Sequence, residues 1–219
     1  NIFFIRPRRF GKSIFLSMLH AYYDCSKKEK FQTLFGDLWV GKHPTPLQGK
    51  FQILHLDFSY VGGSIDKLEE NFNMYLRVKL DGFMRVYQEF YPEDVKEKFF
   101  KSDSATEKLA LLQDETAAKN LPLYLIIDEY DNFTNTVLNE QGENVYWAIT
   151  HADGFYRDVF KKFKGMFERI FITGVSPVTL DDVTSGFNIG WHISTKPGFN
   201  QMLGFSLEEV RKMFAYYKE

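Results

Sequence analysis

Gly11, Lys12 and Ser13 follow an apolar run at residues 2–5 and a turn that contains Pro7. A glycine in such a turn lets backbone N–H groups point inward, and the N-terminus of a following helix favours an anion. A lysine supplies a mobile ammonium for terminal phosphates, and a serine hydroxyl can ligate Mg²⁺. The pattern therefore predicts a phosphate-binding loop at the start of a helix.

This loop departs from the complete P-loop pattern at its first position. The full pattern asks for glycine five residues before Gly11, and Arg6 stands there. A Gly-Lys-Ser triplet is also common by chance, so the triplet alone does not separate a phosphate site from an ordinary turn. The apolar run before it and the apolar helix after it favour the phosphate site.

Asp128 and Glu129 follow a second apolar run at residues 123–127. A nearly continuous apolar run is typical of a central strand covered on both faces, and carboxylates at the C-terminal end of such a strand lie where a parallel sheet binds its ligand. The alternative is that these acids simply solvate the end of the strand. Together with the Gly-Lys-Ser triplet, they predict that Asp128 holds Mg²⁺ and that Glu129 orients and deprotonates an attacking water.

Two further runs are predicted to be strands of the same sheet. Residues 51–58 form a β-rich run, and residues 167–174 form a buried strand that ends in Thr173, shortly before Ser176. His55 lies in the first of these runs. We expect it to be a half-buried strand residue and not a metal ligand, because no second His or Cys lies at ligand spacing.

The segments between these predicted strands have helical periodicity. A helical connection between two strands is typical of a crossover in a parallel sheet. Ser64, Ser104 and Ser206 are expected to be N-caps. The helices are predicted at residues 13–23, 64–91, 92–100, 104–119, 142–164 (as one helix, or as two broken near residues 153–154) and 205–214, with a polar loop or short helix at residues 178–188.

The composition is that of an ordinary globular chain. Its 219 residues with 44% apolar content can form one large α/β domain, and the 23 phenylalanines are expected to fill its core. The single Cys25 excludes an internal disulfide framework and suits a reducing compartment. No apolar run approaches the ~20 residues of a membrane span, and no signal peptide opens the chain. We therefore expect a cytoplasmic protein without a membrane partner. Because the sequence starts with Asn and inside an apparent strand, we also expect it to be a piece of a longer polypeptide.

Charge gives little support for a nucleic-acid partner. The 27 basic and 29 acidic residues leave a net charge of −2, so no global field attracts DNA or RNA. A local basic face is formed by Arg157, Lys161, Lys162 and Lys164. A charged helix face is usually just solvated, and this interpretation is favoured over a phosphate-contacting patch.

Five stretches together resemble the bacterial AAA-ATPase-like family, and the resemblance spans nearly the whole chain. They are residues 6–13, 126–131, 173–177, 185–189 and 202–206. Arg6 in place of the first P-loop glycine is what this family tends to show. Members often carry a PD-(D/E)XK nuclease-like domain C-terminal to the ATPase, so the resemblance implies such a partner domain in the full-length protein.

The resemblance implies an α/β fold of three layers, a P-loop NTPase of the additional-strand type whose parallel central sheet is flanked by helices. The strand at residues 167–173 would lie between the strands that carry the two motifs. Residues 1–200 would form the ATPase core, and residues 201–219 would begin a truncated C-terminal helical lid. Relative to the family, an N-terminal segment, most of the lid and the nuclease-like domain are missing.

Motif chemistry and resemblance together predict a module that binds ATP and Mg²⁺ and hydrolyses ATP to drive or gate a conformational change in a larger protein. Lys12 and Glu129 are the predicted catalytic residues, and Ser13 and Asp128 the predicted metal ligands. The predicted nucleotide contacts are Arg8, Arg9, Phe10, Gly11, Lys12, Ser13, Thr173 and Ser176, with Thr173 or Ser176 sensing the γ-phosphate. No arginine finger is assigned.

Alternatives remain open at two levels. Arg8 and Arg9 either supplement Lys12 on the phosphates or pair with carboxylates such as Asp131. The whole module is alternatively a nucleotide-binding switch with little or no hydrolysis, or a nucleic-acid-associated module that uses its basic face. A P-loop kinase is disfavoured, because the Asp-Glu pair supplies a base suited to water.

Overall fold

The computed structural model describes residues 1–151, 154–176 and 191–218. A five-stranded parallel sheet in the order β2-β3-β4-β1-β5 forms its centre. The strands are β1 (Ile2–Ile5), β2 (Gln52–Asp57), β3 (Leu123–Asp128), β4 (Arg169–Gly174) and β5 (Trp191–His192). The predicted insertion of β4 between β1 and β3 is confirmed.

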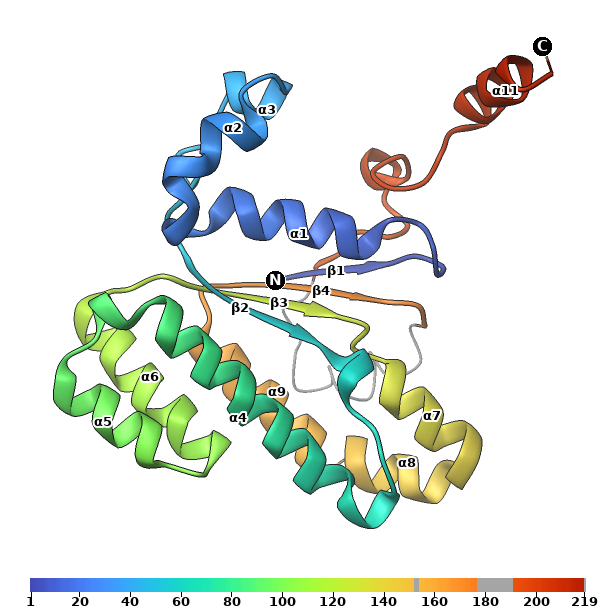
Figure 1. Cartoon of the computed structure of the whole chain (residues 1–219). Coiled ribbons are helices and arrows are strands. Elements are labelled where there is room, and N and C mark those ends of the chain that lie inside the picture. The colour runs from blue at the N-terminus through green and yellow to red at the C-terminus, as the bar shows by residue number, and fades with distance from the viewer. Residues whose placement is uncertain (152–153, 177–190, 219) are drawn as a thin grey trace.

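Helices cover both faces of the sheet and complete three layers (Figure 1). The helix α1 (Lys12–Tyr23) lies on one face, and α4 (Leu68–Val86), α6 (Ala105–Lys119) and α9 (Phe155–Met166) lie on the other. The other α-helices of the described residues are α2 (Phe31–Phe35), α3 (Trp39–Lys42), α5 (Glu93–Lys101), α7 (Asn132–Gln141), α8 (Glu143–Thr150) and α11 (Leu207–Tyr216). The predicted α/β class is correct.

The central strand β3 shows how the sheet divides the core. Its six residues are all buried, as the continuous apolar run predicts. Leu125 and Ile127 pack into the cluster that contains α4, α6 and α9, whereas Tyr124 and Ile126 pack into the cluster on the α1 side. Because side chains alternate along a strand, Asp128 lies on the same face as Tyr124 and Ile126 and is directed toward α1.

Phenylalanine fills both halves of the core, as expected. Phe4 and Phe51 are fully buried on the α1 side. Phe72, Phe99 and Phe163 are fully buried on the opposite side. Burial of an aromatic side chain removes a large apolar area from water, so these rings contribute strongly to the stability of both layers.

The prediction of one long helix from Ser64 to residue 91 is wrong at both ends. Ser64 opens a 3₁₀ turn, η3 (Ile65–Lys67), because its carbonyl accepts the N–H of Lys67 at 3.0 Å. The α-helix begins after it, at Leu68, with Lys67 as an N-cap that makes no side-chain capping bond. A second 3₁₀ turn, η4 (Gln88–Phe90), follows its end.

Further helix predictions meet mixed outcomes. The segment 142–164 forms two helices, α8 and α9, and α7 before them was not predicted. Ser104 caps α6 through the N–H of Glu107, and Ser206 forms a complete capping box with Glu209 at the start of α11. The predicted loop or helix at residues 178–188 lies outside the described residues, as does the motif at 185–189. Within the described ranges, no helix combines the length and apolarity that a membrane crossing requires.

Candidate functional site

The loop between β1 and α1 adopts two left-handed backbone conformations. Gly11 is the N-cap of α1 with φ +85°, and Arg9 has φ +68°. A Cβ on Gly11 would meet no atom within 4 Å, so the backbone angle and not a lack of space favours glycine there. Lys12 and Ser13 therefore start the helix where its N–H groups are directed at the loop.

Lys12 is buried inside this loop, with 5% of its surface exposed. Its Nζ donates hydrogen bonds to the carbonyl oxygens of Arg6 at 3.0 Å and Pro7 at 3.1 Å. No carboxylate among the described residues forms an ion pair with it. An ammonium held only by carbonyl dipoles in a buried position leaves its charge uncompensated, and an arriving anion would be stabilised there.

Ser13, Asp128 and Thr173 form a hydrogen-bonded chain across three elements. The Ser13 hydroxyl at the start of α1 donates to Asp128 Oδ2 at 2.6 Å, and the Thr173 hydroxyl at the end of β4 donates to Asp128 Oδ1 at 2.5 Å. Both hydroxyls thus fix a carboxylate that is 3% exposed. The structure brings together the serine and the aspartate that the sequence predicts to share a metal.

Glu129 follows directly and has a left-handed backbone, with φ +49°. Its N–H donates to Asp128 Oδ1 at 3.0 Å. Partial burial raises the pKa of Glu129, the carboxylates of Asp128 and Asp57 raise it further, and the cations Arg8 and Lys12 lower it. Glu129 is therefore in the electrostatic field of both the acidic strand ends and the cationic loop.

Asp131 was suggested as an ion-pair partner of Arg8 and Arg9, but it binds backbone N–H groups instead. Its carboxylate accepts hydrogen bonds from the backbone N–H groups of Val175, at 3.1 Å, and Ser176, at 2.5 Å. The carboxylate is 1% exposed, whereas Arg8 and Arg9 are exposed on the surface. The suggested pairing of these arginines with Asp131 is wrong, because Asp131 ties the end of β3 to the end of β4.

A family profile described as "Predicted AAA-ATPase" matches residues 1–184. The chain belongs to this AAA-ATPase-like family. Membership identifies it as an ATP-binding ATPase module with a P-loop NTPase fold. Neither the curated proteins nor the solved structures contain a match to the chain.

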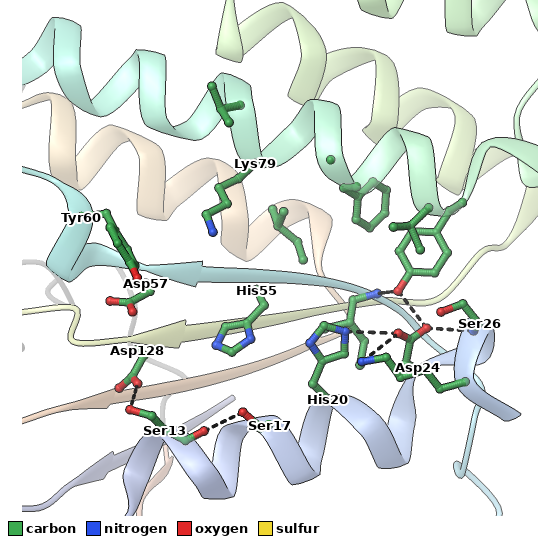
Figure 2. Close-up of a pocket in the computed structure, with 18 residues that line it drawn as sticks. Ser13, Ser17, His20, Asp24, Ser26, His55, Asp57, Tyr60, Lys79 and Asp128 are labelled. Carbon is green, nitrogen blue, oxygen red and sulfur yellow. Dashed lines mark hydrogen bonds and ion pairs between the residues drawn. The ribbon is translucent and has the colours of Figure 1, made fainter. Parts of the chain in front are cut away.

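A groove opens beside Ser13 and Asp128, the predicted metal ligands of this AAA-ATPase-like chain (Figure 2). Its volume is about 730 Å³, and it runs along β2 between α1 and α4. Ser13 and Asp128 line one end of it, Asp57 and His55 line its floor, and Lys79 reaches into it from α4. Asp57 is the last residue of β2, as Asp128 is the last residue of β3. The sequence analysis did not propose Asp57 as a site residue, although the same pattern of an acid after an apolar run marks it.

A second cavity of about 510 Å³ lies where the phosphate loop meets the C-terminal segment. Arg9, Phe10 and Gly11 line it from the loop, and Gly204 and Phe205 line it from the segment before α11. A Cβ on Gly204 would come within 2.8 Å of the Phe10 ring, so glycine permits this close approach. The structure thus places Phe10 against the predicted lid.

The basic face of α9 does not present a uniform positive patch. Lys162 forms an ion pair with Asp158 at 2.7 Å and approaches the hydroxyl of Thr106 at 3.5 Å. An intrahelical i,i+4 pair of this kind is typical of a solvated helix surface. The described residues hold no group of three or more His, Cys, Asp or Glu side chains arranged for a metal. The metal prediction therefore rests on Ser13 and Asp128.

Proposed function

We propose that this AAA-ATPase-like chain binds ATP together with Mg²⁺ and hydrolyses the β–γ phosphoanhydride. The carrying observation is the hydrogen bond of 2.6 Å between Ser13 Oγ and Asp128 Oδ2, beside the buried ammonium of Lys12. The Ser13 hydroxyl, the Asp128 carboxylate and the uncompensated Lys12 ammonium lie at the N-terminus of α1. These are the groups that a metal-bound polyphosphate requires.

The phosphates are assigned to the loop between β1 and α1. Lys12 exchanges its two carbonyl partners for phosphate oxygens, which compensate its charge. The N–H groups at the start of α1 add partial positive charge. The exposed guanidiniums of Arg8 and Arg9 supplement Lys12 on the phosphates, and Phe10 and Gly11 line the nucleotide site.

Ser13 and Asp128 fit a magnesium ion by their chemistry, because Mg²⁺ prefers oxygen ligands and is usually held by one or two side chains plus phosphates. When bound, the ion neutralises phosphate charge and lowers the cost of charge transfer to the leaving group. Thr173 holds the second oxygen of Asp128, so its hydroxyl orients the carboxylate. We assign γ-phosphate sensing to Thr173 or Ser176, which lie where β4 ends.

Glu129 is the proposed general base. Its raised pKa follows from burial and from the neighbouring carboxylates, and it brings the carboxylate nearer to the pKa at which a base works well at neutral pH. Glu129 orients a water and accepts its proton as the oxygen attacks the γ-phosphorus. The proton moves from water to the Glu129 carboxylate, and the bond to the leaving diphosphate breaks.

The proposed output is a conformational change within a larger, cytoplasmic protein. We assign residues 1–200 to the core and residues from 201 to a lid, and the closeness of Phe10 and Gly204 supports contact between the two. A change in the loop on nucleotide binding is therefore passed to the lid through Phe10, beside the packing of Met202 and Leu203 against the core. We propose that a C-terminal nuclease-like domain receives this change in the full-length protein.

The two acids at the end of β3 allow a direct test. Glu129→Gln keeps size and hydrogen bonding but removes the base, so it should bind ATP·Mg²⁺ like wild type while phosphate release falls on the order of 10²-fold or more. Asp128→Asn should instead lose the Mg²⁺-dependent part of the ATP affinity. Calorimetric titration with and without Mg²⁺ and steady-state phosphate release measure both effects.

The test should be run on the full-length protein as well as on this chain, because a lid or a partner arginine affects turnover. If wild type and Glu129→Gln bind ATP equally and release phosphate at the same rate above background, Glu129 is not the base. A nucleotide-binding switch with little or no hydrolysis is then the better description. Phosphate release with and without DNA tests the nucleic-acid alternative.

A further inference from the structure

The groove beside the metal-ligand pair lies on the free edge of the sheet. β2 is the outermost strand next to β3, and the groove follows it between α1 and α4. The loop residues 6–12, which are assigned to the phosphates, do not line it. Its volume of about 730 Å³ is in the range of small-molecule sites, about 300–1,000 Å³. The groove is therefore large enough for a ligand other than the nucleotide.

Tyr75 in α4 and Tyr87 at its C-cap occupy two backbone N–H groups on the outer edge of β2. The N–H of Ile53 donates to the Tyr87 hydroxyl at 2.9 Å, and the N–H of Asp57 donates to the Tyr75 hydroxyl at 2.7 Å. An added peptide strand would need these same N–H groups. The groove thus suits a small molecule better than a peptide.

Lys79 places a cation in the middle of the groove. Its Nζ lies 5.5 Å from the ring centroid of Tyr75 and 5.9 Å from that of Tyr60, and the side chain is half-buried. Throughout the part of the chain that the structure describes, no carboxylate forms an ion pair with it. Asp24, at the other end of the groove, is engaged by His20 and by the backbone N–H of Ser26. An anionic ligand group would compensate the charge of Lys79.

His55 and Asp57 complete the polar floor. Burial, helped by the neighbouring His20 and Lys79 and opposed by the carboxylates of Asp128 and Asp57, lowers the pKa of His55 to about 4. Its ring is therefore neutral at neutral pH and can donate one hydrogen bond. Asp57 Oδ1 accepts the N–H and hydroxyl of Ser59, which fixes the carboxylate beside the metal-ligand end. Lys79 and His55 therefore supply hydrogen-bond donors to the groove, and the Asp57 carboxylate supplies an acceptor at the end near Ser13 and Asp128.

We propose that this groove binds a small hydroxylated oxyanion, either a carboxylate or a phosphate ester. Its oxyanion lies between Lys79 and His55, and its hydroxyl donates to Asp57. The site is separate from the nucleotide loop and does not depend on ATP binding.

The test uses glycerate and glycerol 3-phosphate as probes, with glycerol as the neutral control. Imidazole resonances of His55 are followed by NMR during titration of the Lys12→Ala variant, so that phosphate binding at the loop is removed. We expect saturable shifts with at least one probe and none with glycerol. The tighter of the two probes identifies the oxyanion. Lys79→Met should weaken that binding about tenfold or more, because a charged hydrogen bond is lost.

Lys67→Met is the matched control, since Lys67 is exposed at the start of α4 and does not line the groove. It should leave the affinity unchanged. The proposal is wrong if neither probe shifts His55 at millimolar concentration, or if Lys79→Met binds as well as its parent. Binding that disappears with Lys12→Ala alone also overturns it, because the probe then occupies the loop. Failure of ATP hydrolysis leaves this result unaffected.

Discussion

Lys12 is a buried cation whose hydrogen-bond partners are the backbone carbonyls of Arg6 and Pro7. Lys12→Ala removes the charge that the loop offers to phosphate, so it should abolish measurable ATP binding in calorimetric titration. Lys30→Ala, at an exposed position after α1, is the control and should bind normally. Undiminished affinity in a folded Lys12→Ala protein would contradict the phosphate assignment.

Arg8 is one of two cations that lower the pKa of Glu129, the proposed base. Burial and two carboxylates raise the pKa of Glu129, and Arg8 opposes this rise. Arg8→Ala should therefore raise that pKa further and move the acid limb of the pH profile of turnover to higher pH. If Glu129 is the base, turnover should fall as the pH drops through its folded-state pKa, because a protonated carboxyl group accepts no proton.

Arg9→Ala is the comparison for this pH profile, because Arg9 is not among the charges that act on Glu129. Single-turnover rates at saturating ATP·Mg²⁺ separate the shift from any loss of affinity. An acid limb at the same pH in Arg8→Ala and wild type would show that another group titrates.

At the residue scale, motif chemistry predicted that Ser13 and Asp128 share one site, because each motif fixes a side chain at the end of its own element. The partners of Lys79 and Tyr87 could not be predicted in this way. Their positions depend on how α4 passes the edge of β2, and helical periodicity gives the buried face of a helix but not its offset along a strand.

At the scale of elements, Gly174 lets the ends of β3 and β4 approach each other. A Cβ there would collide with the ring of Tyr130 and with Asp131 Oδ1. Gly174→Ala should destabilise the fold by about 1–3 kcal/mol, because the collision must be relieved by backbone shifts. Thermal or denaturant unfolding measures this change, together with a weakened affinity for Mg²⁺.

Gly82→Ala is the matched substitution for this experiment. A Cβ at Gly82, inside α4, meets no atom within 4 Å, so alanine should stabilise the helix by about 0.5–1 kcal/mol. Equal effects of the two substitutions would show that the approach of Tyr130 to Gly174 does not constrain the site.

The strands were easier to predict than the helices, for a physical reason. A strand buried on both faces must be apolar throughout, and β3 and β4 therefore stand out from their surroundings. Ser64 looked like an N-cap, but the same residue type also opens a turn. Only the packing of Leu68 against the core decides where α4 begins.

At the scale of the whole molecule, nucleotide binding should stabilise the fold. A ligand at about 100 times its Kd adds about 2.7 kcal/mol to the free energy of unfolding. For a chain of this size that is roughly 5–10 °C in the melting temperature. We expect this rise with ATP·Mg²⁺ in wild type and in Glu129→Gln, measured by calorimetry.

Lys12→Ala should show no such rise in melting temperature. An equal rise in Lys12→Ala and wild type would mean that the nucleotide stabilises the protein from another site, such as the groove along β2. Lys79→Met distinguishes the two, since it should keep the full rise if the nucleotide sits at the loop.

The order of the strands at this scale came from the family resemblance. Alternating strands and helices predict a parallel sheet, but several strand orders satisfy that pattern equally. The position of β4 between β1 and β3 matters, because it brings Thr173 within hydrogen-bonding distance of Asp128. The hydrogen bonds of Asp128 to Ser13 and Thr173 thus depend on a strand order that local sequence patterns do not encode.

The hydroxyls of Tyr75 and Tyr87 on the outer strand also have a consequence for solubility. An open strand edge is a template on which another copy of a chain can add its own strand, and this is a route to aggregation. By accepting the N–H groups of Ile53 and Asp57, the tyrosines remove two rungs of that template. The Tyr75→Phe, Tyr87→Phe double variant should therefore aggregate faster than wild type in light scattering, even under conditions where its monomer is still folded.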